Sequence, residues 1–168
     1  MAKLTKVLAI VIHTTATRPV QVLTMATLRN WHRARGFSDV GYHRVIFRNG
    51  KVFTGRKIDE QGAGVQGWNR VTYHISLEGG LNNRTAKPEN NYTEEQFRLL
   101  ELEVRTALAL YPNAVILGHR DLSPDIDGDG TVEKQEWLKE CPCFDAGAWA
   151  KSRGLPGGRL TRGKFVKL

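Results

Sequence analysis

The sequence predicts a single α/β domain with a central mixed β-sheet flanked by α-helices, and three observations indicate this class. The length of 168 residues, with 40% apolar and 25% charged residues, is that of one globular domain. Short apolar runs alternate along the chain with stretches of helical periodicity. Asn49-Gly50 is a strong signal for a hairpin, which adds an antiparallel pair to the sheet.

The first half of the chain predicts three strands and a helix. Residues 7–13 are a continuous apolar run typical of a buried strand. Thr24 is placed to cap a helix that extends to about residue 35. Residues 42–47 and 51–54 flank the Asn-Gly turn and form the two strands of the hairpin.

The second half continues with a strand, a helix, a strand and a helix. A glycine-containing loop at 62–67 leads into an alternating strand at 73–77. A capping box of Thr93 and Gln96 begins the longest helix, and residues 115–117 form a short buried strand. A last helix runs from about 145 to 152. We therefore expect residues 1–150 to form the folded domain.

Charge is distributed unevenly over a net +8. Residues 1–57 contain eleven Lys and Arg against one acid, and residues 151–168 contain six against none. The glycines and proline of 151–168 predict a basic, poorly ordered tail that attracts an anionic cell envelope. Because no helix-turn-helix, zinc-finger or RNA-binding signature is present, we expect no specific nucleic acid partner. We also expect the protein to be a monomer.

The apolar runs predict neither a membrane span nor a signal peptide. The longest, residues 7–12, is far shorter than the roughly 20 residues that cross a bilayer. We therefore expect the protein to stay in the cytoplasm where it is made. Cys141 and Cys143 are separated by one proline, which is too tight for a relaxed disulfide, so both are expected to be free thiols.

Three side chains at the ends of predicted elements are candidates for a metal site: His13, His119 and Cys141. Functional groups gather at strand ends in open sheets. Two imidazoles and a thiolate leave a fourth tetrahedral position open, as in a catalytic zinc site. The alternative is that the histidines are hydrogen-bonded core residues and the cysteine is a small hydrophobe.

Neighbouring motifs make the zinc interpretation more specific. They are Val11-Ile12-His13-Thr14-Thr15, Trp31-His32, Asp39-Val40-Gly41-Tyr42-His43, Gly118-His119-Arg120 and Cys141-Pro142-Cys143-Phe144-Asp145. In this order, over roughly residues 7–150, the chain resembles the zinc N-acetylmuramoyl-L-alanine amidases of the type 2 amidase and peptidoglycan-recognition-protein family. Within it, the chain is most similar to the compact bacteriophage endolysins.

The resemblance implies that His13, His119 and Cys141 bind zinc and that Tyr42 and Lys139 face the reacting water. The substrate would be bacterial peptidoglycan, cleaved between muramic acid and L-alanine during host lysis, after release through a separate membrane pore. Zinc would activate water at neutral pH, and Lys139 and Tyr42 would stabilise charge or relay a proton. Two alternatives stay open, a cytosolic amidase that recycles wall fragments and a peptidoglycan-binding module without activity.

Other residues compete for these roles, and the chain departs from the family at two places. His43 and His32 are rival ligands, and Cys143 is the second choice for sulfur. Members often carry a histidine in the loop where this chain has Gly62-Ala63-Gly64. The small residue of the following strand is replaced by His74, for which the sequence suggests no partner.

A second motif lies between His119 and Cys141, in an acidic insert at 121–138. It matches the calcium loop of an EF-hand, although no helix precedes it. The alternative is a solvated acidic turn. The predicted calcium ligands are Asp125, Asp127, Asp129, Thr131 and Glu136.

Overall fold

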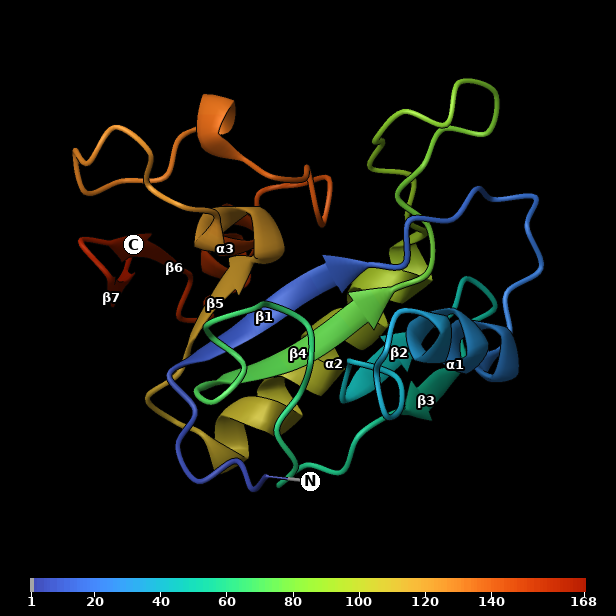
Figure 1. Ribbon diagram of the computed structural model, residues 1–168, viewed down its shortest axis with the longest axis horizontal. Coiled ribbons are helices and arrows are strands. Elements are labelled where there is room, and N and C mark those ends of the chain that lie inside the picture. The colour runs from blue at the N-terminus through green and yellow to red at the C-terminus, as the bar shows by residue number, and fades with distance from the viewer. Residues whose placement is uncertain (1) are drawn as a thin grey trace.

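The computed structural model describes residues 2–168 and is built on a five-stranded sheet (Figure 1). The strands are β1 (Ala9–Thr14), β2 (Arg44–Ile46), β3 (Val52–Thr54), β4 (Thr72–Leu77) and β5 (Val115–Gly118), in the order β3-β2-β4-β1-β5. β1 pairs in parallel with β4 and β5, and β2 pairs in parallel with β4 and antiparallel with β3. The predicted mixed sheet is confirmed.

Three α-helices accompany the sheet, and their ends follow the predicted caps. They are α1 (Met25–Ala34), α2 (Glu94–Leu110) and α3 (Ala146–Ser152). Thr24 caps α1, and Thr93 with Gln96 forms the predicted capping box of α2. Two short 3₁₀ helices, η1 (His119–Leu122) and η2 (Lys134–Glu136), lie in the long segment after β5. Within residues 2–168, no helix has the length and apolar character to cross a membrane.

Successive side chains of β1 point to opposite faces of the sheet, so the strand contributes to the core on both faces. Ile10 and Ile12 point to the face covered by α2 and α3, which lie behind the sheet in Figure 1. Ala9 and Val11 point to the opposite face, where they pack with Val65. His13 continues this second series, so its side chain emerges on the face that α2 and α3 do not cover.

The C-terminal segment is folded, so the prediction of a poorly ordered tail was wrong. Residues Gly158–Thr161 (β6) and Lys164–Lys167 (β7) form an antiparallel hairpin, red in Figure 1. Leu160 and Phe165 are cross-strand partners, and both pack against the apolar cluster around Val11. Glycine is needed at position 158 because a Cβ there would lie 2.5 Å from the Cβ of Val115. The composition suggested disorder, but these two apolar side chains anchor the hairpin.

Candidate metal centre

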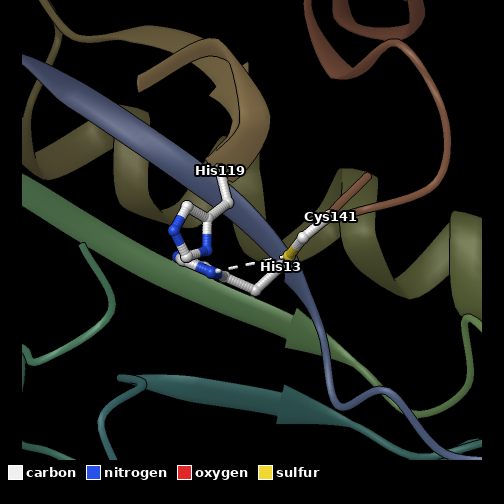
Figure 2. A group of neighbouring side chains, drawn as sticks. All are labelled: His13, His119 and Cys141. Carbon is white, nitrogen blue, oxygen red and sulfur yellow. Dashed lines mark hydrogen bonds between the residues drawn. The ribbon is translucent and has the colours of Figure 1, made fainter. Parts of the chain in front are cut away.

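His13, His119 and Cys141 converge on one point at the carboxyl ends of β1 and β5 (Figure 2). Each offers a ligand atom, and these atoms all lie within 4.8 Å of one another. His13 lies near the end of β1, and His119 is the first residue after β5. Parallel neighbouring strands therefore bring together two histidines that are far apart in the sequence. Cys141 completes the group from the loop before α3, with Sγ 3.9 Å from Nδ1 of His13.

Backbone contacts hold Cys141 beside the two strand ends. The amide of Thr14 donates to the Cys141 Sγ at 3.2 Å, and the amide of Arg120 donates to the Cys141 carbonyl at 2.8 Å. Gly118 allows this approach, since a Cβ there would lie 2.6 Å from Cδ of Pro142. The position of the thiol is thus fixed by β1 and η1 together.

The protonation of these groups suits zinc. Burial is the main cause that lowers the pKa of His13 well below its ordinary value, and burial with the charge of Lys139 lowers that of His119 to about 4. Both imidazoles are neutral at pH 7, which is the form that binds metal. Burial raises the pKa of the Cys141 thiol to about 12, so its proton is lost when a cation binds. Two neutral imidazoles and a thiol are a donor set that fits Zn²⁺.

The rival ligands point elsewhere. Both ring nitrogens of His43 are engaged, because Nδ1 accepts from the amide of His74 and Nε2 bonds the Glu60 carbonyl. Nδ1 of His32 accepts from the amide of Gly41 at 2.8 Å. The Cys143 thiol donates to the carbonyl of Gly80 at 3.3 Å. None of the three belongs to the group formed by His13, His119 and Cys141.

His74 has a partner that the sequence did not suggest. Its Nδ1 lies 3.0 Å from Nε2 of His13, and both rings are buried. The contact joins β4 to β1 across the sheet, between residues 61 positions apart. No short-range pattern could have revealed it.

Tyr42 and Lys139 line a groove that is also lined by His119 and Cys141. The Tyr42 ring centroid lies 5.0 Å from that of His13, and Lys139 lines the space on both sides of His119. The larger part of the groove has a volume of about 870 Å³ and extends between the loop of Trp68 and the C-terminal hairpin. A groove of this size accommodates a small organic ligand or a short peptide.

The acidic loop brings together three of its five predicted ligands. Carboxylate oxygens of Asp125, Asp127 and Glu136 lie within 4.8 Å of one another. Asp129 is outside this group, and its carboxylate accepts instead from the amide and the hydroxyl of Thr131. Backbone amides of the loop donate to Asp125 and Glu136. The loop is thus arranged by hydrogen bonds from its own backbone.

Comparisons with known proteins identify the family of this chain. The family model of N-acetylmuramoyl-L-alanine amidase matches residues 3–142. An uncharacterized protein of Haemophilus influenzae is 45% identical over 104 residues, 62% of this chain and 89% of that protein. The endolysin of Enterobacteria phage K11 is 33% identical over 144 residues, 86% of this chain and 85% of the endolysin.

A solved structure extends the similarity to the fold. The amidase LysC from Clostridium intestinale superposes with a TM-score of 0.66 at 21% identity, covering 89% of this chain and 87% of that one. At this identity the likeness concerns the fold, whereas the family match covers both β1 and the loop of Cys141. This chain therefore belongs to the N-acetylmuramoyl-L-alanine amidase family.

Proposed function

We propose that this protein is a zinc-dependent amidase that cleaves the bond between the lactyl group of muramic acid and L-alanine in bacterial peptidoglycan. The observation that carries the proposal is the convergence of His13, His119 and Cys141, of which His119 and Cys141 line an open groove. Family membership supports the substrate class, and similarity to phage endolysins supports a part in wall degradation.

Residues beside the ligands have the chemistry that amide hydrolysis requires. Zinc, when bound, acts as a Lewis acid that polarises a carbonyl and activates water near neutral pH. The Lys139 ammonium lines the same pocket as His119 and Cys141, where it would stabilise the negative charge that develops on the substrate carbonyl oxygen. Burial raises the pKa of Tyr42, so its hydroxyl keeps its proton and can donate a hydrogen bond to the reacting groups.

We further propose that the protein acts in host lysis, after release through a separate membrane pore. The excess of Lys and Arg, with a net charge of +8, favours attraction to an anionic cell envelope. An amidase that recycles wall fragments in the cytosol is the nearest alternative. A binding module without activity is disfavoured by the presence of Cys141, since all three donors of a catalytic zinc site are present.

The test compares two cysteines that lie two residues apart. Cys141→Ser should lose bound zinc and activity together, whereas wild type should hold about one zinc per chain. Cys143→Ser is the matched control, because serine can keep the hydrogen bond to Gly80. Metal content is measured on purified protein, and new end groups are identified after digestion of peptidoglycan. A Cys141→Ser protein with full zinc and full activity would overturn the ligand assignment.

Calcium binding by the acidic loop remains a separate proposal. It rests on the EF-hand pattern and on the grouping of Asp125, Asp127 and Glu136. A cation there would offset the mutual repulsion of the carboxylates. The loop also contacts the C-terminal hairpin, because the Arg162 amide donates to the Gly130 carbonyl at 2.7 Å. Calcium would therefore stabilise the segment that leads to Lys139 and Cys141.

A further inference from the structure

We infer that His74 is a positioning residue for His13, which it holds in the tautomer that presents Nδ1 toward Cys141 and His119. The inference rests on the proposed zinc site and adds a chain of buried hydrogen bonds behind it. The chain runs from the carbonyl of Trp68 through Thr72 and His74 to His13. Each side chain in it has an exposure of at most 1%.

Which group donates and which accepts in each of these hydrogen bonds follows from the number of protons that the side chains carry. The Thr72 hydroxyl donates its only proton to the Trp68 carbonyl at 2.8 Å. The contact of 3.1 Å between that hydroxyl oxygen and Nε2 of His74 must then be donated by the imidazole. The His74 ring is fully buried and its two partners are a hydroxyl and an imidazole, neither of which stabilises a second proton, so the ring is neutral. With its proton on Nε2, it has only a lone pair on Nδ1. Nε2 of His13 is therefore the donor in the 3.0 Å contact, and its Nδ1 carries a lone pair.

That lone pair is on the side where a ligand atom is needed. Nδ1 is the His13 atom that lies 3.9 Å from the Cys141 sulfur. Histidines that bind metals characteristically donate their other ring N–H to a neighbouring acceptor, which fixes the ring and the tautomer. Here the acceptor is a second imidazole, that of His74. Thr72 therefore sets the tautomer of His74, and His74 in turn sets the tautomer of His13.

Two glycines make room for the His74 ring. A Cβ at Gly62 would lie 2.3 Å from Cδ2 of His74. A Cβ at Gly64 would lie 2.6 Å from Nδ1 of His74 and 2.9 Å from Nε2 of His13, too close to both atoms of their hydrogen bond. The small residues of this loop thus leave the space that the His74 ring occupies.

The neighbouring His43 fixes His74 from the other side. The rings lie 5.7 Å apart and nearly parallel, and Nδ1 of His43 accepts from the His74 amide at 2.9 Å. His74 is thereby held at its backbone, at both ring nitrogens and on one ring face. Such a fully bonded buried group has little freedom to reorient.

The experiment measures zinc affinity by competition with a chromophoric chelator at pH 7, using the full-length protein. His74→Leu removes the acceptor, and Thr72→Val removes the group that sets the His74 tautomer. Both should weaken zinc binding by about 10- to 100-fold, as loss of an outer partner of a metal ligand does. Thr72→Ser keeps the hydroxyl and should bind zinc as wild type does. His74→Asn keeps an acceptor near Nδ1 and should recover part of the loss.

A second measurement does not depend on zinc or on the folding of variants. Nitrogen-15 shifts of the imidazoles in zinc-free wild-type protein should place the proton on Nε2 in both His13 and His74. A proton on Nδ1 of His13, or a Thr72→Val protein with wild-type zinc affinity, would overturn the inference. Failure of wild type to bind zinc would instead refute the proposed function, while the nitrogen shifts would still test the hydrogen-bond directions.

Discussion

Acidification should unfold the zinc-free protein because its histidines are buried as neutral groups. His13, His32, His43 and His74 each have an exposure of at most 2%. Burial is the first cause that lowers the pKa of His43 from 6.5 to about 4, and it acts in the same direction on the other three. In the unfolded chain these groups take up protons near pH 6.5, whereas in the fold they do not.

The sign and size of the effect follow from linkage. A histidine with a depressed folded-state pKa contributes stability that is complete above the unfolded pKa and is lost as pH falls toward the folded value. Between pH 6.5 and 5.5, each such group should cost about 1 kcal/mol of unfolding free energy. His119, whose pKa is also lowered to about 4, brings the number of such groups to five, and together they should cost about 5 kcal/mol, a large share of the roughly 5–15 kcal/mol typical of a domain.

The assay is urea unfolding of zinc-free protein at several pH values in this interval, with circular dichroism as the signal that reports unfolding. His32→Asn is the matched variant, since an amide oxygen can replace Nδ1 as acceptor from Gly41 without titrating. Its loss of stability on acidification should be about a fifth smaller than that of wild type. An unfolding free energy that stays constant between pH 6.5 and 5.5 would refute the reasoning.

Three further predictions concern the groove, the hairpin and the acidic loop. Lys139→Ala and Tyr42→Phe should keep zinc but lower turnover on peptidoglycan by about 100- to 1,000-fold, and unchanged turnover would contradict their proposed roles. Deleting residues 157–168 should lower the melting temperature, because Leu160 and Phe165 leave the core cluster; an unchanged melting curve would show that the hairpin contributes no stability. Millimolar calcium should raise the melting temperature of zinc-loaded protein, and Asp125→Ala with Asp127→Ala should abolish this increase. Absence of binding heat by calorimetry would refute calcium binding and show that the loop is a solvated acidic turn.

Local signals in the sequence predicted most of the elements. The Thr93 capping box and the Asn49-Gly50 turn specify their structures within a few residues, and both are present. The C-terminal hairpin was missed because its stability comes from contacts with distant residues. Phe165 packs edge-on against Trp68, with ring centroids 5.1 Å apart, and this contact leaves no trace in the composition of the tail.

The candidate site was predictable only in part, for the same physical reason. Strand ends and the family resemblance indicated His13, His119 and Cys141, which the fold brings together. The partner of His13 could not be found, because the pairing with His74 depends on the parallel register of β1 and β4. Side-chain alternation gives the face of a strand, whereas only the assembled sheet decides which strand lies beside it.

The separation of the three ligands along the chain has a consequence for folding kinetics. His13 and Cys141 are 128 positions apart, so the complete donor set exists only after β1, β5 and the loop before α3 have come together. Contacts of such high sequence separation form slowly, since loop closure must precede them. Zinc therefore cannot nucleate this fold as it does in a small zinc finger, where the ligands are close in sequence. Its stabilisation should appear as slower unfolding, with little change in the refolding rate.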